Sequence, residues 1–198
     1  GALELRLIYD VVCEVVGGGE LPEGASPMPW DYDLDQIPLD LDDPFDNDSV
    51  QRALARVTQC TGLSLAPALR TPPQRDRLER LMTLAGISSE DFLAVNLAYA
   101  TFALGDLVRS PDKLANRNPF DTRSVDYGDA EVNAKVPRFA PDPFAQWDLV
   151  RTSSLDGYGT HKVLSLHTSG DELLPPQHQQ ALSNLYRPDR LAQAVATE

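Results

Sequence analysis

The chain has 198 residues and a formal net charge of −13 at pH 7, from 30 acidic residues against 17 lysines and arginines. Because phosphate contacts require basic side chains, this balance argues against nucleic acid and anionic membrane surfaces as partners. The length predicts one domain, with room for a subdomain, and 42% hydrophobic residues are typical of a soluble globular protein. No apolar run approaches the ~18 residues of a membrane span, so none is expected.

The first predicted element is an apolar helix over residues 3–16, which Gly17, Gly18 and Gly19 end. Residues 20–48 follow without helical periodicity and are rich in proline and aspartate. They predict a solvated acidic loop.

A calcium loop within this acidic segment is the alternative. Asp31, Asp33 and Asp35 have the alternate spacing of calcium ligands, and Asp42 holds the twelfth place. A twelve-residue calcium loop of this kind has glycine at the sixth place and a bidentate glutamate at the twelfth. Here those places hold Gln36 and Asp42, so we expect no metal, with calcium binding by residues 31–48 left open.

Three helices are predicted next, joined by short loops as in a small bundle. Ser49 is expected to cap the first, which ends at Cys60. Thr71 and two prolines start the second, which runs to Leu84 and stops at Gly86.

The third helix, residues 89–108, opens at Ser88 and is apolar on most sides. A helix of this kind is buried or covers something. It is either the core helix of the bundle or an apolar wall over a substrate pocket, for which Tyr99 and Phe102 are the candidates.

The remaining residues mix irregular chain, helices and one strand. Residues 110–145 are irregular apart from a short helix over 130–136, and 144–155 predict another helix. A buried strand is predicted over 163–166, and a final short helix over 188–196.

Asp171 is the candidate catalytic residue. Gly170 permits a sharp turn after the strand, and Pro175 and Pro176 suit the first turn of a following helix. In open α/β sheets, catalytic groups collect outside the carboxyl ends of strands. Asp171 is therefore placed as a catalytic acid, with a solvated turn aspartate as the alternative.

Two stretches carry a family resemblance. The first is Asn118-Pro-Phe-Asp-Thr-Arg-Ser-Val-Asp-Tyr-Gly128 with Glu131-Val-Asn-Ala-Lys-Val-Pro-Arg-Phe139 and Asp142-Pro-Phe-Ala145, and the second is Val163-Leu-Ser-Leu-His-Thr-Ser-Gly-Asp171. Together they resemble a group of secreted bacterial α/β-hydrolases, serine esterases, lipases and peptidases. That group has Asn-Pro-Phe-Asp-Asn, Tyr-Gly, Asn-x-x-Val-x-Arg and Leu-His-Thr-x-Gly-Asp in the same order. Thr122 stands where the second asparagine is expected. The resemblance is good over residues 114–186 and loose over 1–62.

The resemblance implies an α/β fold class, mainly helical as an isolated chain. The chain would be an α/β-hydrolase piece, a helical lid plus the late strand–helix unit that carries the triad acid. Residues 1–19 would lead into the lid, 20–145 would form it, and 146–198 would belong to the hydrolase core. Asp171 would be the acid of a Ser-Asp-His triad, and the protein would be secreted or periplasmic.

The departures from the family pattern concern the other two triad members. The chain has no Gly-x-Ser-x-Gly elbow, and the triad order is Ser, Asp, His. His161 and His167 precede Asp171, and His178 follows it too closely, inside the next helix. The nucleophile and base are therefore expected on a complementary polypeptide, and His167 is expected to be structural.

The cysteines Cys13 and Cys60 are expected to form a disulfide, because the resembling group is exported and the intervening loop has no regular pattern. Two buried free thiols are the alternative. The cysteine and histidine spacing does not suggest zinc.

The expected function is part of a serine hydrolase that cleaves an ester, or less readily a peptide bond, without a cofactor. A non-catalytic acidic helical interaction domain is the alternative from another class. A third interpretation is a self-contained enzyme using Ser153, Ser154 or Ser169 with His161 or His167, although no elbow motif supports it.

Overall fold

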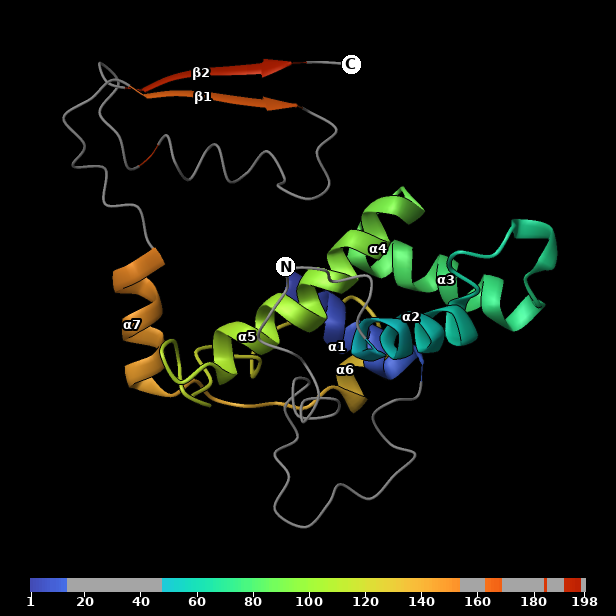
Figure 1. The fold of residues 1–198 in the computed structure, drawn as a ribbon, viewed down its shortest axis with the longest axis horizontal. Coiled ribbons are helices and arrows are strands. Elements are labelled where there is room, and N and C mark those ends of the chain that lie inside the picture. The colour runs from blue at the N-terminus through green and yellow to red at the C-terminus, as the bar shows by residue number, and fades with distance from the viewer. Residues whose placement is uncertain (14–47, 154–162, 169–183, 185–190, 197–198) are drawn as a thin grey trace, which may run out of the picture. The chain divides into compact units, whose positions relative to one another are not determined.

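The computed structural model describes residues 1–13, 48–153, 163–168, 184 and 191–196. Its internal contacts divide the chain into two units, Gly1–Gln146 and Trp147–Glu198. The described part of the first unit is helical, and that of the second contains a pair of strands (Figure 1).

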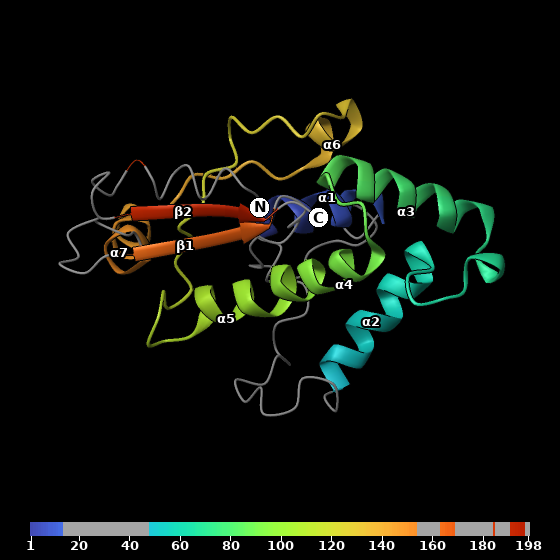
Figure 2. The same cartoon turned by 90° about the horizontal axis from the view of Figure 1, so that it is seen from above.

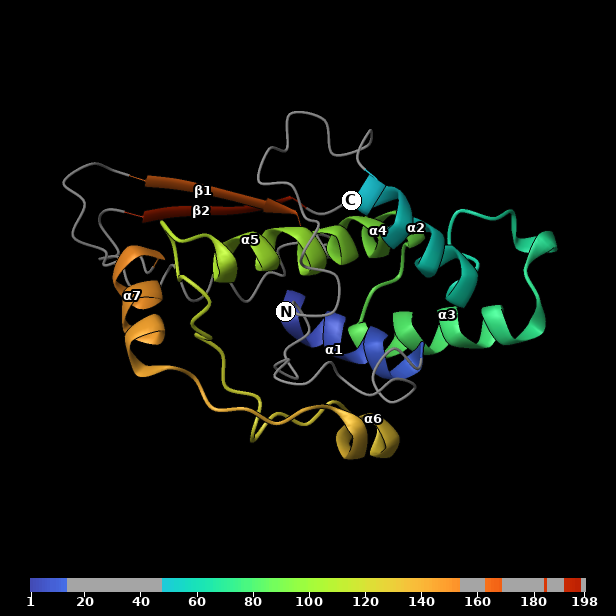
Figure 3. The same cartoon turned by 60° about the horizontal axis from the view of Figure 1, so that its bottom comes forward.

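Helix α1, Ala2–Val12, is the central helix of the first unit (Figure 3). Leu7 is completely buried, and even the charged Arg6 and Asp10 are buried. Arg6 Nε donates to Asp10 Oδ1 at 2.9 Å, one turn along the helix, so each charge has a partner. The helix packs against α3 (Pro72–Ala85), α4 (Glu90–Ala98), the π-helical turn η4 (Tyr99–Ala103) and α6 (Ala130–Lys135). It is the core around which these elements assemble.

Helices α2, Asp48–Thr61, and α3 lie side by side. The α3 boundaries confirm the prediction: the Thr71 backbone N–H donates to Gln74 Oε1 at 2.9 Å, and Gly86 ends the helix with a left-handed φ of 67°. The predicted cap of α2 is wrong. Ser49 lies inside the helix, which begins at Asp48.

One long helix follows, made of α4, the wider π turn η4 and α5, Leu104–Arg109 (Figure 2). It confirms the predicted helix over 89–108, except that its N-cap is Ser89 and not Ser88. Single-turn π segments inside α-helices occur frequently at functional sites.

Two shorter helices confirm the prediction for residues 130–136 and, up to Ser153, the prediction for 144–155, whose last two residues lie outside the described ranges. Helix α6 starts at Asp129, whose Oδ1 accepts the Val132 N–H at 2.9 Å. Helix α7, Pro143–Ser153, starts in the same way, because Asp142 Oδ1 accepts from Ala145 N at 2.9 Å.

The two strands are β1, Val163–Thr168, and β2, Leu191–Ala196, and they run parallel (Figures 1 and 2). Strand β1 confirms the predicted strand and extends it by two residues. The helix predicted over 188–196 is wrong, because Leu191–Ala196 is a strand. Its alanines favour a helix locally, but hydrogen bonding to β1, far away in the sequence, overrides that propensity.

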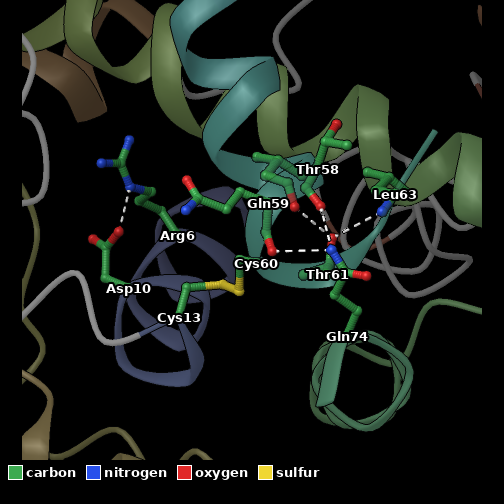
Figure 4. Close-up of a disulfide and its surroundings, with 10 residues drawn as sticks. Arg6, Asp10, Cys13, Thr58, Gln59, Cys60, Thr61, Leu63 and Gln74 are labelled. Atoms are coloured by element: carbon green, nitrogen blue, oxygen red, sulfur yellow. Dashed lines mark hydrogen bonds and ion pairs between the residues drawn. A yellow bond between two sulfur atoms is a disulfide. The ribbon is translucent and has the colours of Figure 1, made fainter. Parts of the chain in front are cut away.

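Cys13 and Cys60 form a disulfide with a Cα–Cα distance of 5.7 Å (Figure 4). Cys13 is the C-cap of α1 and Cys60 lies in the last turn of α2. The bond therefore fastens the end of the buried helix to the neighbouring helix and closes the segment that contains the acidic loop.

We expect the double variant Cys13→Ser/Cys60→Ser to lose up to about 4 kcal/mol of unfolding free energy. Without the cross-link the unfolded chain regains the entropy of a loop with a sequence separation of 47. Urea unfolding followed by circular dichroism measures the loss. Dithiothreitol should weaken the wild type equally and leave the variant unchanged; a loss below about 0.5 kcal/mol would contradict this role.

Candidate functional site

The parallel strand pair defines one candidate site. Thr168 lies opposite Ala196 in the register, so the carboxyl ends of β1 and β2 meet at one edge of the sheet. Asp171 follows Thr168 by three positions and lies outside the described residues, as do Gly170 and His178. Its role as the triad acid stays a prediction. The structure shows the sheet edge at which β1 ends, three residues before Asp171.

The serines and histidines of the self-contained alternative lie mostly outside the described residues. Ser153 is the last residue of α7, and His167 is in β1 opposite Val195. Ser154, His161 and Ser169 are not described. That alternative, and the structural role expected for His167, remain untested.

The long helix Glu90–Arg109 has apolar side chains on two opposite faces. One face buries Leu93, Leu97 and Val108 in the core around α1. The other carries Phe92, Val95 and Tyr99, which are 37%, 43% and 55% exposed. One face of the helix is therefore core, as the first interpretation predicts. The other face is exposed among the described residues, and its role as a wall over a substrate pocket stays a prediction.

Tyr99 and Phe102, the predicted pocket residues, belong to this second face. Tyr99 is exposed and Phe102 is half-buried. We call Phe92, Val95, Tyr99 and Phe102 the apolar stripe, since residues spaced by three and four align along a helix. Phe92 and Val95 were not among the predicted pocket residues, although the same helical spacing places them on this face.

The helix also reaches the length of a membrane span. Its 20 residues, Glu90–Arg109, are long and apolar enough to cross a bilayer by length and composition alone. The sequence predicted no apolar run of this length. A few polar residues interrupt the helix, but its mean hydropathy stays high enough for a membrane span. Core helices of soluble proteins meet the same criteria, so this is weak evidence and the expectation stays a prediction.

The Asn118 motif, which carries the first part of the family resemblance, is a structural turn. Asn118 Nδ2 donates to the carbonyls of Phe120 at 2.8 Å and Ala140 at 3.1 Å. Thr122, the departure from the family pattern, is 1% exposed, and its hydroxyl donates to Pro137 O and accepts from Phe139 N. These polar side chains satisfy buried backbone groups and join two separate segments.

The second half of the motif is also held by its own polar residues. Arg138 donates to the carbonyls of Thr122, Val125 and Asn133 at 2.7, 2.6 and 3.1 Å. Asn133 Oδ1 accepts from the Tyr127 backbone at 3.0 Å, and the Arg138 guanidinium lies 5.2 Å from the Tyr127 ring centroid. These resemblance residues therefore hold the fold of the loop through side chain to backbone hydrogen bonds.

Tyr127 is the least satisfied polar group of this loop. Its hydroxyl is buried and has no hydrogen-bond partner among the described residues. Burial raises its pKa to about 12, and the nearby Glu4 carboxylate acts in the same direction. The phenol therefore stays neutral at physiological pH.

Three aspartates in the same loop have lowered pKa values. Hydrogen bonds from Arg123 lower the pKa of Asp121 to about 2. The backbone N–H of Gly128 lowers the pKa of Asp126, and that of Val132 lowers the pKa of Asp129, with help from Arg80. All three stay ionised, as structural acceptors.

Within the described ranges, no group of three or more histidine, cysteine, aspartate or glutamate side chains could hold a metal ion. The calcium alternative lies in residues 31–48, of which only Asp48 is described. It stays open.

Comparison with known proteins adds no relative: no family model, no curated protein and no solved structure matches the chain. The function must be argued from the strand edge, the apolar stripe and the sequence.

We expect substitutions on the two faces of the long helix to differ in stability. Leu97→Ala should cost about 2–5 kcal/mol because it opens a cavity in the core. Tyr99→Ser should change the unfolding free energy by no more than about 0.5 kcal/mol because the side chain is exposed. Urea unfolding compares them, and an equally large loss for Tyr99→Ser would show that the stripe is covered.

We expect the stability of the protein to fall as the pH drops from 3.8 to about 2. The pKa values of Asp121, Asp126 and Asp129 are lower in the folded state than in the unfolded state, so their stabilisation is present above the unfolded pKa and is lost as pH falls through the folded pKa. Unfolding free energies measured across this range should show a shallower decline for Asp121→Asn, because the folded pKa of Asp121 sets the lower end of the range. Parallel curves would contradict the assignment.

Proposed function

We propose that the chain is the lid and acid-bearing strand of a secreted or periplasmic serine hydrolase that cleaves an ester bond. A peptide bond is the second choice. The observation that carries the proposal is the parallel pair β1–β2, with Asp171 following the carboxyl end of β1.

The topology of the pair suits a triad. Parallel strands need a crossover connection, which here spans residues 169–190 and contains the predicted proline-started helix. In the order Ser, Asp, His the base comes after the acid. A residue that follows β2 lies at the same sheet edge as one that follows β1, because Thr168 and Ala196 are opposite each other.

In this proposal Asp171 accepts a hydrogen bond from one ring nitrogen of the base histidine. That bond holds the tautomer and stabilises the imidazolium that forms when serine attacks the carbonyl. The serine, the oxyanion-hole donors and the histidine belong to a complementary polypeptide with a Gly-x-Ser-x-Gly elbow.

Two further features support an exported ester hydrolase. Disulfides persist in oxidising compartments, which agrees with the Cys13–Cys60 bond. An uncharged, exposed stripe that includes Tyr99 suits the acyl part of an ester more than a charged substrate. Tyr99 and Phe102 remain the candidates for contacts with that group.

The second candidate is a non-catalytic interaction domain. Among the described strands, β1 pairs only with β2, and parallel sheets are normally larger and covered on both faces. A partner sheet that adds strands to this pair would satisfy the same geometry without catalysis.

Fluorophosphonate labelling of the protein purified from its source, followed by denaturing mass spectrometry, separates these functions. Label on a second chain, with this 21.7 kDa chain unmodified, is expected. Label on this chain would overturn the division of the triad between polypeptides. Folded material without label would overturn the hydrolase proposal and favour the interaction domain.

In the same assembly without the label, Asp171→Asn should lower turnover by a factor on the order of 10⁴, by analogy with serine proteases that lack the triad acid. The adjacent Glu172→Gln is the matched control and should leave turnover unchanged. Equal effects of the two substitutions would remove Asp171 from the triad.

A further inference from the structure

A pocket of about 320 Å³ is lined by α3 and by the segments just before and after it, up to Glu90. Part of its lining is apolar, since Leu78 and Ile87 are buried and Met82 is half-buried. Its volume is at the low end of the range for ligand pockets, so it suits a small molecule.

Two opposite charges of this pocket come from one face of α3. Arg75 and Glu79 both line the pocket and are exposed. Neither forms an ion pair or a side-chain hydrogen bond with the residues that the structure describes. Residues spaced by four on a helix have Cβ atoms about 5–6 Å apart, so the two charged ends can reach the same small ligand.

The other two charges in the lining neutralise each other. Arg70 donates from Nη1 and Nη2 to the two carboxylate oxygens of Glu90 at 2.6 and 2.5 Å. The same guanidinium donates from Nε to the carbonyls of Gly62 and Leu65, both at 3.1 Å. Arg70 is therefore engaged with the protein, and a ligand meets one cation and one carboxylate on α3.

We propose that this pocket binds the zwitterion of a free apolar α-amino acid. The Arg75 guanidinium binds the α-carboxylate, and the Glu79 carboxylate binds the α-ammonium group. The side chain of the amino acid contacts Leu78, Met82 and Ile87, where its apolar surface is removed from water. The proposal is independent of the hydrolase function.

Other classes of small ligand match the pocket less well. A carboxylic acid without an amine pairs with Arg75 but is repelled by Glu79, and an amine without a carboxylate has the opposite problem. The net charge of −13 also disfavours simple anions. A zwitterion is neutral overall and satisfies both side chains.

Three derivatives of leucine test the charge requirement on the whole chain: leucine, N-acetyl-leucine, which lacks the ammonium charge, and leucinamide, which lacks the carboxylate. A ¹H–¹⁵N NMR titration at neutral pH and low salt gives the affinities and the location. We expect saturable shifts of amides in α3 and residues 87–90. Leucine should bind about fivefold more tightly than either derivative, the upper end for one exposed ion pair. Alanine should bind about tenfold more weakly than leucine because it has less apolar surface.

Substitutions on α3 separate the two charges. Arg75→Gln should bring leucine and leucinamide to equal affinity, and Glu79→Gln should do the same for leucine and N-acetyl-leucine. Both side chains are exposed, so neither substitution should unfold the protein. Arg77→Gln, on the same helix but outside this pocket, is the control and should preserve the wild-type order.

Four results would overturn the proposal. They are no saturable binding of leucine, equal binding of the three derivatives by the wild type, amide shifts confined to other parts of the chain, and unchanged affinity ratios in Arg75→Gln and Glu79→Gln.

Discussion

The burial of α1 on every side is the constraint on which the first unit depends. Its leucines and valines have no exposed face, so other helices must surround it, and even Arg6 and Asp10 are enclosed and paired. Removing one partner of such a pair leaves a buried charge, which is more destabilising than the pair is stabilising. The disulfide then fastens the end of this helix to α2.

The residues that carry the family resemblance have an architectural role where the structure describes them. Asn118, Thr122, Asn133 and Arg138 satisfy backbone groups of the loop between α5 and α7. Such bonds depend on the path of the chain, so these side chains specify how this loop folds. Chemistry must be argued from Asp171 and the strand edge before it.

The chain combines two surfaces of different chemistry. The carboxyl ends of β1 and β2 meet at one sheet edge, and the apolar stripe is uncharged in a chain of net charge −13. Each suits a different kind of ligand.

Local sequence determined the elements whose ends are satisfied within a few residues. Thr71 with Gln74 and the left-handed Gly86 mark the ends of α3, and Asp129 marks the start of α6. The sequence predicts these caps because each side chain bonds groups that lie within a few residues of it. The nearby Ser88 and Ser89 could not be separated by the same signals, since each can cap a helix.

Tertiary structure decided what depends on distant residues. Leu191–Ala196 has a helical composition and becomes a strand because β1 offers its backbone groups. The helix 89–108 carries apolar side chains on most of its sides. The position of α1 decides that Leu97 is buried in the core and that Tyr99 stays exposed. A pocket beside Cys13 and Cys60 joins residues from three helices. Burial and strand pairing are relations between distant segments, and local propensity carries no information about them.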